Sequence, residues 1–160
     1  PFYAMNADVD VRRFLSPLTR ADSDSFLDRI DAHFAEYGWG FWALEQAETG
    51  KLVGMCGIMH VAWDAPFGKA VELSWRLAPK WQGQGLALEA AQASVWFGLD
   101  VLKLDRLVAF TAGDNVASRR LMERLGMRDI GCFDNPFLET GHPLSSQVLC
   151  EITQTNLKEE

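Results

Sequence analysis

One stretch of the sequence, residues 72–87, constrains the fold more than any other. Its first part, residues 72–77, reads Glu-Leu-Ser-Trp-Arg-Leu and has the character of a β-strand. A turn with two glycines, Gly83 and Gly85, follows, and a helix rich in Ala and Leu begins directly after it. The backbone N–H groups of such a turn and the positive end of the helix point at one place. This arrangement favours a bound anion, above all a pyrophosphate.

The glycine turn does not match the two best-known phosphate-binding loops. A nucleoside-triphosphate loop needs Lys and then Ser or Thr after its last glycine, whereas Leu86 and Ala87 follow Gly85. The dinucleotide fingerprint needs a third glycine, and this sequence has Leu88 in its place. Two interpretations therefore stay open: a cradle for a different phosphate ligand, or a tight turn that binds nothing.

Hydrophobic periodicity predicts the remaining elements in a definite order. Helices are expected over residues 1–14, 22–37 and 86–99, and from Asp114 or Asn115 to about Leu125. Strands are expected over residues 40–46, 51–60, 70–77, 106–111, 127–133 and 147–153. This order predicts a mixed α/β domain of the α+β class and excludes a regularly alternating, doubly wound fold.

Composition excludes several classes of protein. The 160 residues are enough for one domain with its own core, with 48% hydrophobic and 23% charged residues. A net charge of −7 repels nucleic-acid phosphates and favours cationic partners, and no apolar run reaches the roughly 18 residues that span a membrane. Three widely spaced cysteines predict no disulfide framework and hence a cytoplasmic protein. No metal site is expected, because His142 has no partner at metal-ligand spacing.

Two motifs make the sequence resemble a known family. The pattern Gln82-x-x-Gly85-x-Ala87 is similar to the Q/R-x-x-G-x-G/A signature of the GNAT superfamily of acetyl-CoA-dependent N-acetyltransferases. Residues 115–118, Asn-Val-Ala-Ser, with Gly-Met at 126–127, are similar to the N-x-x-A/S…G-F helix of that superfamily. Within the superfamily, residues 75–85 look most like the branch of ribosomal-protein N-terminal acetyltransferases.

The resemblance implies one acetyltransferase domain over residues 1–160, with a central mixed, mostly antiparallel sheet, splayed middle strands and helices on both faces. The family usually opens with a β-strand that is missing here. Pro1 stands where an initiator Met is expected, which suggests a start part-way along a longer chain. The pantetheine arm of acetyl-CoA is expected between the splayed strands. The residues implied to bind the cofactor are Leu73, Trp75, Arg76, Leu77, Gln82, Gly83, Gln84, Gly85, Leu86, Ala87, Asn115, Ser118 and Arg119.

Attack of an amine on a thioester requires a general base and donors for the developing oxyanion, but no covalent enzyme intermediate. We expect Glu72 to be the base, because it lies between Val71 and Leu73 on the strand that lines the cleft. Burial there raises the pKa of a carboxyl group towards neutrality. The alternatives are that Glu72 faces solvent and that Glu139 or His60 is the base.

The proton donor to the leaving thiolate is less well defined. Many members of the family carry a Tyr four residues after the Ala/Ser position of the second motif, and Met122 stands there in this sequence. Ser118 can replace this acid, or the thiolate can leave unassisted and Ser118 is then a helix-start hydroxyl. Arg119 either meets a CoA phosphate or belongs to a solvated helix face.

Two functions therefore compete. The first is an N-acetyltransferase that moves an acetyl group from acetyl-CoA to a primary amine, either a protein N-terminus or a small molecule, in a ternary complex. The alternative is a non-catalytic acyl-CoA-binding module of the same fold. We expect no membrane or direct nucleic-acid partner, and a monomer or homodimer. Acceptor selectivity is expected in the first two helices and in the loop over residues 133–146.

Overall fold

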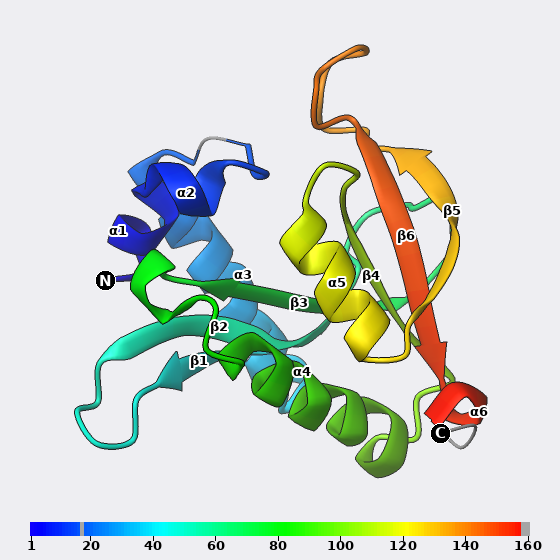
Figure 1. Ribbon diagram of the computed structural model, residues 1–160, viewed down its shortest axis with the longest axis horizontal. Coiled ribbons are helices and arrows are strands. Elements are labelled where there is room, and N and C mark those ends of the chain that lie inside the picture. The colour runs from blue at the N-terminus through cyan, green and yellow to red at the C-terminus, as the bar shows by residue number, and fades with distance from the viewer. Residues whose placement is uncertain (17, 158–160) are drawn as a thin grey trace.

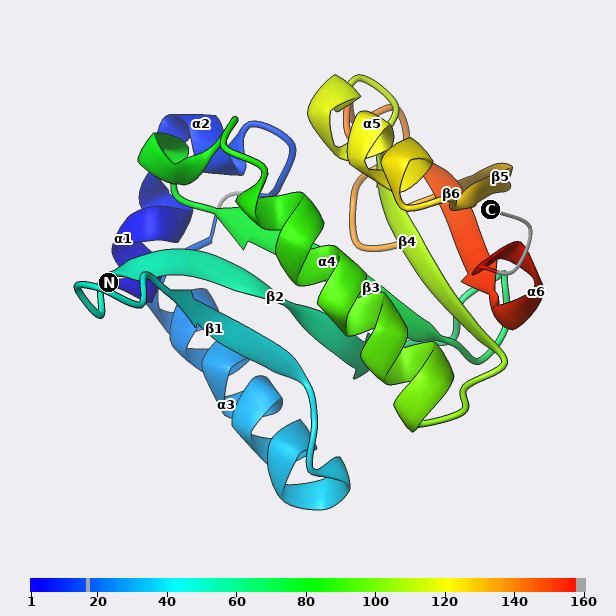
Figure 2. The ribbon, with the colours of Figure 1, turned by 60° about the horizontal axis from the view of Figure 1, so that its bottom comes forward.

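The computed structural model describes residues 1–16 and 18–157, and its helices cover both faces of a central sheet (Figures 1 and 2). The elements are α1 (Phe2–Ala7), α2 (Val9–Arg12), α3 (Arg20–Tyr37), β1 (Phe41–Glu45), β2 (Leu52–His60), β3 (Val71–Leu77), α4 (Leu86–Trp96), β4 (Arg106–Ala112), α5 (Val116–Arg124), β5 (Arg128–Asp134), β6 (Ser146–Thr153) and α6 (Gln154–Leu157). The expected order of elements is confirmed from α3 to β6, whereas the sequence pattern did not predict α6. Within the described ranges, no helix combines the length and apolar character needed to cross a membrane.

The six strands form one sheet in the order β1-β2-β3-β4-β6-β5. All neighbours are antiparallel except β3 and β4, which run parallel and share a single register pair, Glu72 with Val108. Beyond that pair the two middle strands diverge, as Figure 2 shows. The predicted α+β fold, with a mostly antiparallel sheet and splayed central strands, is confirmed. The divergence leaves strand edges without partners in the centre of the sheet.

Strand β2 explains how the core is divided between the two faces. Its residues are buried almost without interruption, so successive side chains enter different layers. Cys56 and Ile58 belong to the core beneath α4 and α5, together with Ala91 and Leu121. Met55 and Met59 belong to the core beneath α3, in a cluster that also contains Ile30, Phe41, Phe2, Phe26 and Phe34. A helix therefore covers each face of this half of the sheet.

The N-terminal helices differ from the expectation in their ends. The segment expected to be one helix over residues 1–14 is two short helices, because Asp8 is extended and its carboxylate accepts a hydrogen bond from Asp10 N at 2.9 Å. Helix α3 begins two residues earlier than expected. Thr19 and Asp22 form a reciprocal capping box that fixes this start.

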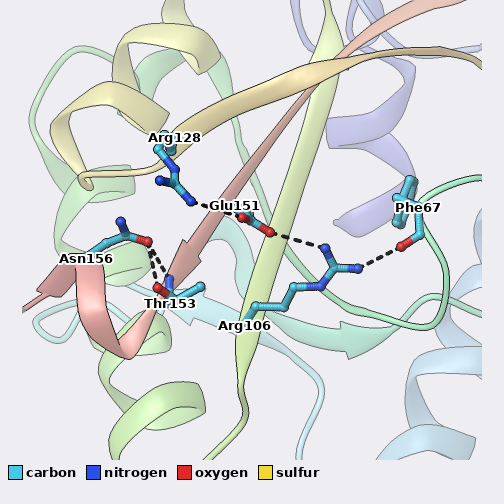
Figure 3. Close-up of polar contacts among 6 residues, drawn as sticks. All are labelled: Phe67, Arg106, Arg128, Glu151, Thr153 and Asn156. Carbon is cyan, nitrogen blue, oxygen red and sulfur yellow. Dashed lines mark hydrogen bonds and ion pairs between the residues drawn. The ribbon is translucent and has the colours of Figure 1, made fainter.

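The other half of the sheet is tied together by one carboxylate (Figure 3). Glu151 on β6 accepts from Arg106 on β4 at 3.2 Å and from Arg128 on β5 at 3.5 Å. Arg106 also donates to the carbonyl oxygen of Phe67, in the loop between β2 and β3, at 2.7 Å. These contacts join β4, β5, β6 and that loop into one unit, which forms the second wall of the opening between β3 and β4.

Candidate active site

A cleft of about 670 Å³ occupies the opening between the diverging strands. Its walls come from β3 and β4, the glycine turn and the start of α4, the inner face of α5, five residues of the segment 10–16, and four residues of the segment 135–147. The residues predicted to bind a cofactor that line it are Leu73, Trp75, Arg76, Leu77, Gln82, Gly83, Gly85, Leu86, Ala87, Asn115 and Ser118. Segments far apart in the sequence therefore meet in one cavity large enough for a small-molecule ligand.

The alternation of β3 gives the cleft two sides. Trp75 points towards α5, where its indole Nε1–H donates to Ser118 Oγ at 3.2 Å. Arg76 points the opposite way, towards α1, and its Nη1 donates to Asn6 Oδ1 at 2.7 Å. Glu72 stands four residues before Arg76 and hence on the same side. We call these the α5 side and the α1 side of the cleft.

The glycine turn opens the α5 side to a ligand. Gly83 and Gly85 have φ of 72° and 80°, the left-handed conformation that glycine adopts without a steric penalty. A Cβ added to either residue would meet no other atom within 4 Å, so the space beside the backbone is open. Gly85 is the N-cap of α4 and offers no side-chain cap, and the first helical hydrogen bond is donated by Glu89 N. The N–H groups before Glu89 are therefore available to a bound group.

Two glutamines hold the shape of this turn. Gln82 Nε2 donates to the carbonyl oxygen of Leu77 at 3.0 Å, and Gln84 Nε2 donates to that of Lys80 at 2.9 Å. Gln84 is exposed and does not line the cleft. These side chains support the loop, and the glycines beside them, Gly83 and Gly85, face the cleft.

Sequence reasoning missed three polar groups beside the turn. Trp81 lines the cleft, and its buried Nε1–H has no hydrogen-bond acceptor within the described residues. Arg120 and Arg124, one helical turn apart on α5, also line the cleft. Arg119 does not, and its guanidinium donates to the carbonyl oxygen of Gly113 at 3.1 Å. An open backbone cradle, an orphaned N–H donor and two arginines fit a ligand with several phosphates.

The start of α5 is held by its own capping residue. Asn115 Oδ1 accepts from Ser118 N at 3.2 Å, and Asn115 Nδ2 donates to Thr111 Oγ1 at 3.0 Å. Ser118 Oγ accepts from the indole of Trp75, and its own hydrogen has no protein acceptor among residues 1–16 and 18–157. Met122 is buried and lines the cleft one turn later. Ser118 is therefore a hydroxyl donor fixed at the centre of the α5 side.

The structure places Glu72 in the cleft wall and not on an outer surface. Burial raises the pKa of Glu72 to about 7, while the nearby cations Arg76 and Arg29 lower it. A carboxyl group with this pKa is shared between its two protonation states at neutral pH. It can therefore accept a proton from a reacting group, as a general base must.

The two other candidate bases lie away from the cleft. Glu139 is exposed on the loop between β5 and β6 and is not among the lining residues. His60 Nδ1 lies 2.9 Å from His33 Nε2, and His33 Nδ1 lies 2.7 Å from the carbonyl oxygen of Trp39. This pair joins the end of β2 to α3. Of the three candidates, Glu72 alone faces the cavity.

Comparison with known proteins identifies the family. The profile of the Acetyltransferase (GNAT) domain matches residues 1–128. The chain belongs to the GNAT acetyltransferase family. This acetyltransferase is 37% identical over 134 residues to the uncharacterized N-acetyltransferase YnaD of Bacillus subtilis (strain 168), a match that covers 82% of this chain and 74% of YnaD.

Solved structures agree with this assignment. A GnaT-family acetyltransferase from Bordetella pertussis superposes with a TM-score of 0.76 and 27% identity, over 93% of this chain and 86% of that one. A spermidine N-acetyltransferase from Vibrio cholerae, solved in complex with CoA and spermine, superposes with a TM-score of 0.73 over 96% of this chain and 88% of that one. It is 17% identical, a likeness that shows the shared fold.

Proposed function

We propose that this acetyltransferase, acting as one domain over residues 1–160, transfers the acetyl group of acetyl-CoA directly to a primary amine in a ternary complex. The proposal rests on one observation. A single cleft connects the uncapped start of α4 with the carboxylate of Glu72. An acetyl donor whose phosphates lie at the start of α4 would meet an amine that lies at Glu72, at the point where β3 and β4 diverge. The Vibrio cholerae neighbour, with CoA and spermine bound, supports this pairing of donor and amine.

Acetyl-CoA would supply the acetyl thioester, and the chain would bind and orient it. The N–H groups of Gly83, Gly85 and the first residues of α4, with Trp81 Nε1–H, would donate hydrogen bonds to the pyrophosphate. Arg120 and Arg124 would take further phosphate charge. The free edge of residues 73–77 would hydrogen-bond the pantetheine amides.

Glu72 would prepare the amine. Its carboxylate accepts a proton from the ammonium group, because its raised pKa matches the task at neutral pH. The C–N bond would then form as the C–S bond breaks. Ser118, whose Oγ accepts from Trp75, would stabilise the leaving sulfur by donating its hydroxyl hydrogen to it. The ammonium loses two protons in all, of which one ends on the thiol and the other is released to solvent.

The acceptor would be a small-molecule amine or a protein N-terminus. Its channel would be the α1 side of the cleft, where residues such as Phe14 and Leu138 form the walls. Cys56, Cys132 and Cys150 are free thiols, which supports a reducing, cytoplasmic setting. The second candidate, a non-catalytic acyl-CoA-binding module, draws support from Met122 in the place where many relatives have a Tyr.

The deciding experiment is a screen of amines with acetyl-CoA that follows release of free thiol over many turnovers. Glu72→Gln should lower kcat/KM by about 10²–10⁴ and abolish its fall below pH 7, with CoA affinity retained. Glu139→Gln, which removes a carboxylate outside the cleft, is the matched control and should leave the pH profile as it is. CoA binding without turnover on any amine would favour the binding module. Equal rates of Glu72→Gln and the parent protein would exclude Glu72 as the base.

A further inference from the structure

The side chain of Arg76 lies on the α1 side of the cleft and has no role in the proposed mechanism. Its guanidinium is held by two contacts. Nη1 donates to Asn6 Oδ1 at 2.7 Å, and the guanidinium carbon lies 5.7 Å from the ring centroid of Phe26. Asn6 is itself only 2% exposed and donates to Ser23 Oγ at 3.3 Å. Residues of α1 and α3 therefore hold this cation against the cleft wall.

The guanidinium forms no ion pair within the described residues, although the charge of Glu72 acts on it. Among the described residues, no carboxylate oxygen lies within 4.0 Å of it. An arginine carries five N–H donors, and Arg76 donates one of them to a protein acceptor in this structure. Burial lowers the pKa of Arg76 to about 10, while the nearby Glu72 raises it. A half-buried cation of this kind is unfavourable until an anion reaches it.

A second cation lies near Arg76, although the chain as a whole is negative. Arg29 lies against the same Phe26 ring, 5.3 Å from its centroid. Glu72, the nearby carboxyl group, is partly protonated at neutral pH because of its raised pKa. Asp10 also lines the cleft, so this wall carries charges of both signs, with Arg76 as its half-buried cation.

We propose that Arg76 binds a carboxylate of the acceptor, so that the preferred substrates are amines that carry a negative charge several bonds from the nitrogen. The proposal rests on the proposed transfer to amines and deepens it. Four residue steps along the strand separate the Cα atoms of Glu72 and Arg76 by about 13 Å, a span that the two long side chains shorten. The amine would lie at Glu72 and the carboxylate at Arg76. Phe14 and Phe110 would cover the chain between them.

The test uses acceptor pairs that differ in one charge. The first set compares 4-aminobutyrate and 6-aminohexanoate with their own amides. The second set compares the C-terminally amidated dipeptides Ala-Asp and Ala-Asn, so that a free amino acid and a peptide N-terminus are distinguished as sources of the carboxylate. In at least one set, the carboxylate should be preferred about tenfold or more in kcat/KM.

Variants then assign the preference to one residue. Arg76→Gln should bring the ratio of carboxylate to amide close to one, and Arg76→Lys should leave an intermediate ratio because Lys cannot form the forked contact. Arg29→Gln is the matched control: it removes a charge from the other contact of Phe26, does not line the cleft and should keep the parent ratio.

The outcomes separate this inference from the function beneath it. Turnover of amines with no preference for the carboxylate in the parent protein overturns the role of Arg76 alone. A preference for the carboxylate that survives Arg76→Gln also overturns the role of Arg76. Should that variant fail to fold, an unchanged ratio of carboxylate to amide in Arg76→Lys decides against the proposal. Absence of turnover with every amine overturns the acetyl-transfer function, and the inference falls with it.

Discussion

The environment that suits Glu72 to catalysis should cost the free protein stability. Glu72 sits in the cleft wall, where burial raises its pKa from 4.5 to about 7. A raised pKa means that the folded state binds the proton more tightly than the unfolded state. The favourable contribution of protonated Glu72 to the stability of the fold is therefore fully present below pH 4.5, is lost as the pH rises to 7, and is absent above that value. Ionised Glu72 therefore weakens the fold at the pH where it acts.

The magnitude follows from the same values. The difference between the two pKa values is about 2.5 pH units, and 1.36 kcal/mol per unit gives about 3 kcal/mol. Glu72→Gln keeps the shape of the protonated acid but cannot ionise. The variant and the parent protein should thus have nearly equal free energies of unfolding at pH 4. Above pH 8 the variant should be more stable by about 3 kcal/mol.

The measurement is urea unfolding of both proteins at intervals from pH 4 to pH 8.5, without acetyl-CoA. Glu45→Gln, at an exposed carboxylate of β1, removes the same charge and serves as the control, whose difference from the parent should not grow over this range. A stability difference between Glu72→Gln and the parent that is the same at pH 4 and pH 8.5 would refute the reasoning. The side chain would then be as well solvated in the fold as in the unfolded chain.

Three further predictions concern other parts of the structure. Gly85→Ala and Gly50→Ala both place a side chain at positive φ and should lose similar stability. Only Gly85→Ala should raise the Kd for CoA, measured by calorimetry, at least tenfold. Equal Kd values for the two variants would contradict a phosphate cradle at Gly85. Ser118→Ala should lower kcat about tenfold at saturating acetyl-CoA, whereas an unchanged kcat would leave Ser118 as a partner of Trp75 only. Burial, with the charge of His33, lowers the pKa of His60 below 6.5, so the contribution of His60 to stability is present above that pH and lost as the pH falls. His60→Asn should therefore lose less stability than the parent protein when urea unfolding is repeated at acidic pH. An equal loss of stability in the two proteins would contradict this role of His60.

The sequence was sufficient for the features that depend on neighbours along the chain. Residues 72–87 predict strand, glycine turn and helix because backbone conformation and period are local properties. The apolar run over residues 51–60 predicts the strand β2 by the same reasoning, and its burial on both faces is known from the structure. The family motifs at Gln82–Ala87 and Asn115–Ser118 are equally local, and the family assignment drawn from them is confirmed. The role of each residue within them stays a prediction.

Tertiary structure decided which side chains meet. Arg76 and Asn6 are 70 residues apart, Trp75 and Ser118 are 43 apart, and His33 and His60 are 27 apart. Such pairs depend on strand order, register and the face that each strand turns towards a helix, none of which a periodic pattern encodes. The choice of Arg120 and Arg124 over Arg119 for the cleft wall follows from the rotation of α5 on the sheet. The chain determines its elements through local sterics and polarity. The chemistry of the cleft, including the raised pKa of Glu72, arises only when distant segments exclude water from it together.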